Sequence, residues 1–120
     1  MEKVAVVGAS TKPDRYSNKA MKLLAEYGHT PLPVAPGHKT VEGRKAFSSL
    51  GEIHEKIDTV TLYLGPARQE DVIKEILNIR PKRVIFNPDT ENQTAADTLK
   101  QAGITVLEAC TLVLLKTNQF

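Results

Sequence analysis

The sequence predicts an α/β fold in which helices cover both faces of a mostly parallel sheet. Short apolar runs alternate with segments of helical periodicity, at a spacing that leaves crossovers of about 10–15 residues. Glycine and proline stand at the boundaries between these segments, where they end strands and helices. Right-handed crossovers place the first strand centrally. A ligand crevice is then expected at the carboxyl ends of the strands that flank the switch point of the sheet.

The first half of the chain begins with an apolar, β-branched run at residues 3–8, which is typical of a strand buried on both faces. A helical period follows from Ser17, the expected N-cap, and Gly28 is its expected stop. We expect a second strand at residues 30–34. It contains two prolines at alternate positions, so their missing N–H groups can both point away from one neighbouring strand.

The second half shows the same alternation after a less periodic stretch at residues 35–55. Thr90-Glu91-Asn92-Gln93 fits a capping box and predicts the start of a helix that stops at Gly103. The expected elements are an edge strand at 44–47, a helical turn at 48–53, strands at 57–64, 83–86 and 104–107, a helix between Pro66 and Pro81, and a closing helix at 111–116.

The 120 residues are expected to form one domain, residues 1–120. A net charge of only +2 and 5% aromatic residues argue against nucleic acid as the partner. The single cysteine, Cys110, fits a reducing cytoplasm, and no signal or membrane-spanning segment is evident. We therefore expect a cytoplasmic protein that binds a small nucleotide ligand and no membrane. The sequence leaves a homo-oligomer or a separate protein partner open.

The loop after the first strand is incomplete as a dinucleotide fingerprint. Gly8 occupies the first glycine position of G-x-G-x-x-G, but Ser10 and Pro13 stand at the second and third. The loop also carries Lys12 and Arg15, so it favours phosphates, though not those of NAD. Backbone N–H groups of residues 8–10 could approach a phosphate in front of the following helix. The alternative is a tight turn without a ligand.

The loop after the second strand has no acidic residue to hold a ribose 2′-hydroxyl. Lys39 there indicates a ligand with an additional ribose phosphate, either NADP or a 3′-phosphorylated adenosine, unless it is simply a solvated lysine. The three histidines lack metal-ligand spacing, and no nucleophile–His–acid set can be assembled. We predict no catalytic residue and no metal site. Cys110 is interpreted as a small core residue, or alternatively as a thiol that lines the ligand channel.

Three segments together resemble one family: V-A-V-V-G-A-S-x-K-P-x-R-Y-S, P-V-A-P-G-H-K-x-V-E-G-R-K-A-F-x-S-L and G-I-T-V-L-E-A-C. The chain is similar to small stand-alone CoA-binding proteins, and through them to the CoA-binding N-terminal domain of the succinyl-CoA synthetase α subunit. The resemblance implies a Rossmann-like, three-layer α/β/α fold with strand order 3-2-1-4-5-6. It also implies CoA, or an acyl-CoA, as the ligand.

The resemblance assigns twelve residues to this ligand. The loop that holds the diphosphate would supply Gly8, Ala9, Ser10, Lys12, Arg15, Tyr16 and Ser17; Pro36 and Lys39 would flank the 3′-phosphate; Leu64, Gly65 and Pro66 would face the adenine or the pantetheine. Two departures matter. His38 separates Lys39 from the Pro-Gly that the lysine usually follows, and the chain stops before the synthetase domain that bears the phosphorylated histidine. No ligase chemistry is implied.

These observations favour a protein that binds CoA or acyl-CoA and is not catalytic on its own. A small NADP-dependent oxidoreductase or redox sensor is the alternative, because the same loops could hold NADP. An oligomeric interaction protein whose crevice has lost its ligand is a third hypothesis.

Overall fold

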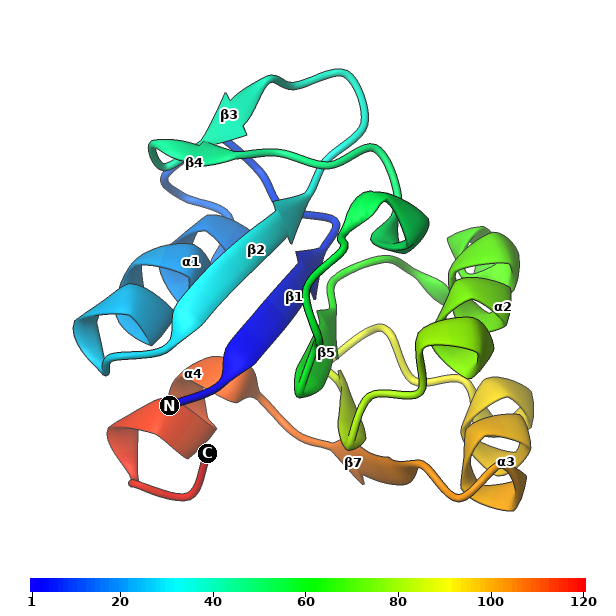
Figure 1. Cartoon of the computed structure of the whole chain (residues 1–120). Coiled ribbons are helices and arrows are strands. Elements are labelled where there is room, and N and C mark those ends of the chain that lie inside the picture. Colours follow the sequence, from blue (N-terminus) through cyan, green and yellow to red (C-terminus); the bar gives the residue numbers. More distant parts are fainter.

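The computed structural model describes residues 1–120 and places a central sheet between two layers of helices (Figure 1). Its elements, in chain order, are β1 (Lys3–Val7), α1 (Tyr16–Glu26), β2 (Thr30–Val34), β3 (Thr40–Val41), β4 (Arg44–Lys45), η1 (Leu50–Glu52), β5 (Thr59–Leu62), η2 (Pro66–Arg68), α2 (Glu70–Ile79), β6 (Arg83–Phe86), α3 (Gln93–Gln101), β7 (Thr105–Glu108) and α4 (Thr111–Lys116).

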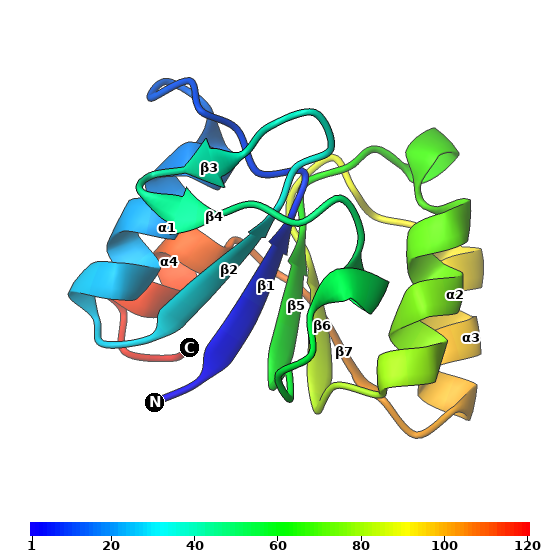
Figure 2. The same ribbon diagram turned by 45° about the horizontal axis from the view of Figure 1, so that its top comes forward.

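Five strands form the parallel sheet in the order β2-β1-β5-β6-β7. Helices α1 and α4 cover one face, while α2 and α3 cover the other (Figure 2). The predicted α/β class and the central position of the first strand are confirmed. No helix of the structure is both long enough and apolar enough to span a bilayer.

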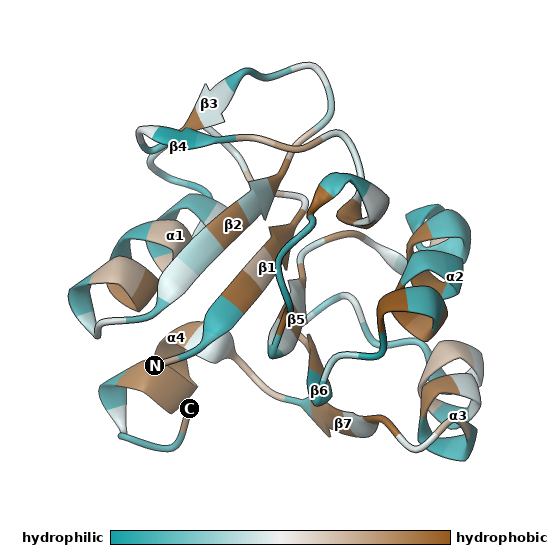
Figure 3. Cartoon of the chain, in the orientation of Figure 1, coloured by the Kyte–Doolittle hydropathy of each residue, from teal (hydrophilic) through white to brown (hydrophobic).

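Strand β1 supplies side chains to both cores because successive residues of a strand point to opposite faces. Val4 and Val6 pack towards α1 and α4, in a cluster with Met21, Leu24 and Leu115. Ala5 and Val7 join the larger cluster under α2 and α3, with Ile73, Ile76 and Leu99. Figure 3 shows the result: apolar residues dominate β1, and the exposed faces of the helices are mainly hydrophilic.

The expected strand order 3-2-1-4-5-6 is wrong in detail, because residues 44–47 do not form a strand of the sheet. Strand β4 pairs antiparallel with β3, and only Phe47 reaches the sheet, through an isolated parallel bridge to Val34. The prolines of β2 explain this. The carbonyl of Pro33 accepts from the Phe47 N–H at 2.9 Å, so Pro33, and Pro31 two residues before it, face the outer edge. That edge lacks the donors that another strand would need.

The two predicted N-caps are wrong, whereas the predicted helix stops at Gly28 and Gly103 are confirmed. Helix α1 begins at Tyr16 with Arg15 as a cap residue that makes no side-chain hydrogen bond, so Ser17 lies inside the first turn. Helix α3 begins at Gln93, where Oδ1 of Asn92 accepts from the Ala95 N–H at 3.1 Å. The Thr90 hydroxyl donates instead to the Asn87 carbonyl at 2.7 Å. The strands expected at 3–8 and 57–64 are shorter, at Lys3–Val7 and Thr59–Leu62, and the one expected at 104–107 shifts by one residue.

Candidate ligand-binding site

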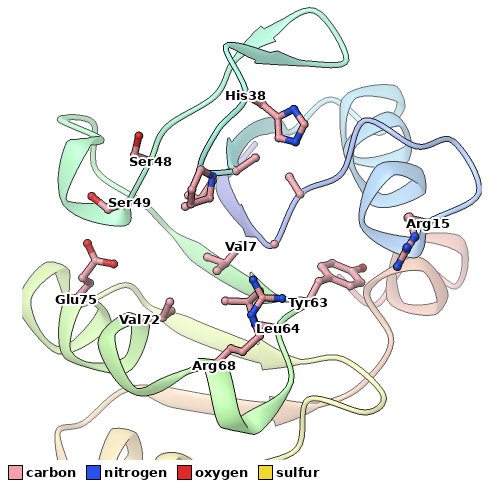
Figure 4. Close-up of a pocket in the computed structure, with 15 residues that line it drawn as sticks. Val7, Arg15, His38, Ser48, Ser49, Tyr63, Leu64, Arg68, Val72 and Glu75 are labelled. Carbon is pink, nitrogen blue, oxygen red and sulfur yellow. The ribbon is translucent and has the colours of Figure 1, made fainter.

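The cavity with the most lining residues, called the main cavity below, lies at the carboxyl ends of β1 and β5, where the chain switches from one side of β1 to the other. It has a volume of about 340 Å³ and is shown in Figure 4. Three loops meet in it: the loop after β1, the segment after β2, and the residues that follow β5. Ser48, Ser49, Val72 and Glu75 complete its lining. The sequence predicted this position from the crossover rule, and the structure brings all three expected loops together there.

Gly8 is required where the loop leaves β1. Its φ is +85°, and a Cβ atom built on it would lie 3.1 Å from the Leu64 Cδ2 and from the carbonyl carbon and oxygen of Tyr63. The N–H groups of Gly8 and Ala9 both donate to the Val34 carbonyl, at 3.1 and 3.3 Å. These two amides extend the pairing with β2, so they are not available to a phosphate, contrary to the expectation from the sequence.

The amino end of α1 offers donors in their place. The first intrahelical bond runs from the Lys19 N–H to the Arg15 carbonyl at 3.1 Å, and the three N–H groups before it have no protein acceptor. No side chain caps this end, and the first turn has no acidic residue. Ser10, Arg15, Tyr16 and Ser17 line an adjoining hollow of about 420 Å³ at this helix end. Unpaired N–H groups and the positive end of the helix dipole suit an anion.

Positive side chains approach the main cavity from two sides. Arg15 lies at one end of it and Arg68, from η2, lies beneath its centre (Figure 4). His38 lines the same cavity from the segment after β2. The opposite end holds the Glu75 carboxylate, whose Oε2 accepts from the Gly51 N–H at 3.0 Å.

Tyr63 separates the main cavity from two further hollows and contributes to the walls of all three. Its hydroxyl is buried and makes no hydrogen bond within the protein. Burial raises the pKa of this phenol to about 12, and the nearby hydroxyls of Thr111 and Thr61 oppose the shift only partly. A buried polar atom without a partner is rare in folded proteins. Because this hydroxyl has no exposed surface, a ligand in the cavity could reach it only after the Tyr63 side chain moves.

The third hollow, of about 320 Å³, lies beyond Tyr63 and is lined by Tyr16, Asn87, Pro88, Asp89 and Cys110. Asn87 is rigidly held: its Nδ2 donates to the Thr61 hydroxyl at 2.6 Å and to the Leu62 carbonyl at 2.8 Å, and its Oδ1 accepts from the Thr111 N–H at 2.9 Å. Cys110 is half-buried and faces this hollow. Cys110 is therefore not a fully buried core residue, and it lies beside a hollow next to the main cavity.

Most of the residues singled out from the sequence line the first two hollows: Gly8, Ala9, Ser10, Arg15, Tyr16, Ser17, Pro36, Leu64 and Gly65. Lys12 and Lys39 are exposed and line none of the hollows. Pro66 lies on the outer groove between α2 and α3. No group of three or more side chains is placed to hold a metal ion.

Sequence reasoning missed several residues of the site: Tyr63, Arg68, Ser48, Ser49, Val72 and Glu75. Arg68 was detectable, because it follows Gly65-Pro66 within the loop that was already expected to face the ligand. The sequence pattern predicts Tyr63 as part of a strand. In the structure β5 ends at Leu62, so Tyr63 follows the strand and lines the cavity.

The fold and the site together define a Rossmann-like α/β domain in which two arginines line a crevice at the carboxyl ends of the strands. Comparison with known proteins identifies the family: the pattern of the CoA-binding domain matches residues 2–116, and the chain belongs to this family. It is 33% identical to the uncharacterised protein YneT of Bacillus subtilis over 106 residues, which are 88% of this chain and 78% of YneT.

Solved structures share the fold. A crystal structure described as that of an uncharacterised protein is 36% identical, with a TM-score of 0.87, and the match covers 100% of this chain and 98% of that one. A hypothetical protein from Pyrococcus horikoshii is 32% identical, with a TM-score of 0.92 and coverages of 97% and 82%. The match to acetyl-coenzyme A synthetase 1 of Ca. Korarchaeum cryptofilum, at 19% identity and a TM-score of 0.78, covers 90% of this chain and 25% of the synthetase and shows the fold alone.

Proposed function

We propose that this protein binds CoA or an acyl-CoA in the crevice at the carboxyl ends of β1 and β5 and catalyses no reaction by itself. The observation that carries the proposal is a crevice with two arginines and an open helix end in a chain of the CoA-binding domain family. CoA has a diphosphate and a 3′-phosphate, with roughly four negative charges near neutral pH. Such a ligand matches a site with several separate donors better than a site with a single cation.

The structure supports a specific orientation of the ligand. The N–H groups at the start of α1, together with Arg15, would hold the diphosphate. Pro36 and His38 would lie beside the ribose, where Lys39, the next residue, can reach the 3′-phosphate from outside. The pantetheine arm would then pass Tyr63 towards the hollow that Cys110 lines.

An NADP-dependent redox function is the second candidate, because the segment after β2 has no acidic residue and NADP also has a ribose phosphate. Isothermal titration with CoA, acetyl-CoA, dephospho-CoA, NADP and NAD separates the two. The proposal expects binding of CoA and acetyl-CoA, weaker binding of dephospho-CoA, and none of NAD. Binding of NADP without CoA would refute it.

Two variants test the residues. Arg15→Gln removes a charge-assisted hydrogen bond of about 1.5–3 kcal/mol, so the Kd for CoA should rise roughly 10- to 100-fold. Lys100→Gln, on the exposed surface of α3, removes one positive charge far from the crevice and is the matched control. Lys39→Ala should weaken CoA far more than dephospho-CoA. If both ligands weaken equally, Lys39 does not bind the 3′-phosphate.

A further inference from the structure

A buried group of hydrogen-bonded residues, Asn18, Ser10 and Glu42, connects the loop after β1 to the β3–β4 hairpin, and we call it the joint. Asn18, in the first turn of α1, has no exposed surface. Its Nδ2 donates to the Ser10 carbonyl at 2.9 Å and to the Glu42 Oε2 at 2.9 Å. Ser10 belongs to the loop after β1, and Glu42 is at the tip of the β3–β4 hairpin, which lies over the amino end of α1 (Figures 1 and 2). One side-chain amide therefore links the hairpin, the loop and the helix.

The joint is unfavourable for local stability in two respects. Glu42 has a φ of +50°, a left-handed conformation that strains any residue with a Cβ and that glycine would adopt without cost. Asn18 leaves its Oδ1 buried without a partner. The two-residue turn itself needs the positive φ of Glu42 and of Gly43, but glycine or asparagine meets that need at lower cost than glutamate does. The Glu42 side chain is therefore best explained by what it holds in place.

The hairpin is the continuation of the segment that flanks the cavity. Pro36 and His38 line the cavity just before β3, and the Lys39 carbonyl accepts from the Ala46 N–H at 2.9 Å. Buried Val41 anchors the apolar side of the hairpin. The polar side is held by Glu42, whose Oε1 also lies 4.0 Å from the Nζ of Lys22 on the outer surface of α1. Displacement of the tip would move residues 38 and 39 relative to the loop at Ser10.

We propose that Asn18 and Glu42 are positioning residues that hold the β3–β4 hairpin against the loop after β1, so that residues 38 and 39 face the ribose phosphate of the ligand. This inference rests on the proposed binding of CoA. It assigns a role to a strained glutamate and a buried asparagine that do not themselves touch the ligand. Because the hairpin faces one part of the ligand only, the joint contributes to the selection of a 3′-phosphorylated nucleotide.

Three variants isolate the joint. Glu42→Gly removes the carboxylate and relieves the strained backbone, so the chain should remain folded. Glu42→Gln keeps an oxygen that can accept from Asn18. Arg80→Gly is the matched control, because Arg80 has the same φ of +50° but ends α2, away from the crevice. Titration of each variant with CoA and with dephospho-CoA, alongside thermal unfolding without ligand, gives the required comparison.

We expect Glu42→Gly to weaken CoA about tenfold through loss of preorganisation and to change the Kd for dephospho-CoA little. Glu42→Gln should restore most of the CoA affinity, and Arg80→Gly should bind as the wild type does. Unchanged CoA affinity in Glu42→Gly, or equal losses for both ligands, would overturn the positioning role. Failure of the wild-type protein to bind CoA would instead refute the proposed function, so the two results are distinguishable.

Discussion

The Gly8→Ala variant tests how much the close contact between Gly8 and Tyr63, at the carboxyl ends of β1 and β5, contributes to the free energy of unfolding. Two separate costs apply. A residue with a Cβ at φ +85° loses about 1–2 kcal/mol in the left-handed region. The new methyl group would also lie 3.1 Å from backbone atoms of Tyr63, which cannot move without disturbing the end of β5; overpacking of this kind costs about 1–3 kcal/mol. The sum is roughly 2–5 kcal/mol.

Gly103→Ala separates the two costs. Gly103 has a φ of +84°, but a Cβ built there meets no atom within 4 Å. This variant should lose only the backbone cost, about 1–2 kcal/mol. Urea denaturation of both variants and the wild type measures the free energy of unfolding directly. We expect Gly8→Ala to lose about 1–3 kcal/mol more than Gly103→Ala. Equal losses would show that the close approach to Tyr63 has no energetic weight.

Three further predictions concern polar groups. Asn87→Ala should lower the free energy of unfolding by about 2–4 kcal/mol, because Thr61, Leu62 and Thr111 would lose their hydrogen bonds to this buried side chain. A decrease below about 1 kcal/mol in urea denaturation would contradict this prediction. Tyr63→Phe should leave that free energy unchanged or raise it by up to about 1 kcal/mol, since the buried hydroxyl has no hydrogen-bond partner; a loss above about 1 kcal/mol in urea denaturation would show that the Thr111 or Thr61 hydroxyl bonds to it. Acidification should destabilise the protein through His29. The His29 Nδ1 accepts from the Glu2 N–H at 3.1 Å, and burial lowers the pKa of this imidazole in the folded state. Below about pH 6.5 the unfolded chain therefore binds a proton at His29 more readily than the folded chain does. Stability measured by urea denaturation should therefore fall from pH 7.5 to pH 5, with a smaller slope in His29→Gln than in the exposed control His54→Gln.

Strong local signals explain what could be predicted of the fold. Residues 30–34, 83–86 and 111–116 have the expected structure because apolar runs and turn residues bound them clearly. The expected edge strand forms only in part, as β4, and does not join the parallel sheet, for a reason that is not local. Residues 44–47 have a sequence that suits a strand, but the edge available to them is the one on which Pro31 and Pro33 lack donors. The two prolines face the outer edge because β2 pairs with β1 on its other side. This pairing cannot be predicted from residues 44–47 themselves.

The predicted N-cap of α3 is wrong because two similar residues compete for that position. Thr90 and Asn92 can both cap a helix, and the sequence favours Thr90 because a capping box needs Gln93 three residues later. In the structure the Thr90 hydroxyl instead closes the turn after β6 by donating to Asn87, which leaves Asn92 to cap α3. The choice depends on the buried position of Asn87 and therefore on tertiary structure.

The loop after β1 shows how one glycine can serve a different purpose from the one its position suggests. In a dinucleotide fingerprint the glycines allow the backbone to approach a pyrophosphate and the helix to pack closely on the strand. Here Gly8 allows the approach of Tyr63 and Leu64, while its N–H and that of Ala9 extend the pairing with β2.

In the proposed complex, phosphate would therefore be bound by groups further along the chain, where the open N–H groups of α1 and the Arg15 guanidinium lie. This arrangement does not require glycine at position 10 or 13. It does require the loop to be held at a fixed distance from the helix, and the bond from Asn18 to the Ser10 carbonyl provides that. The serine and proline that break the fingerprint are thus compatible with a phosphate site whose donors lie on a helix end and an arginine.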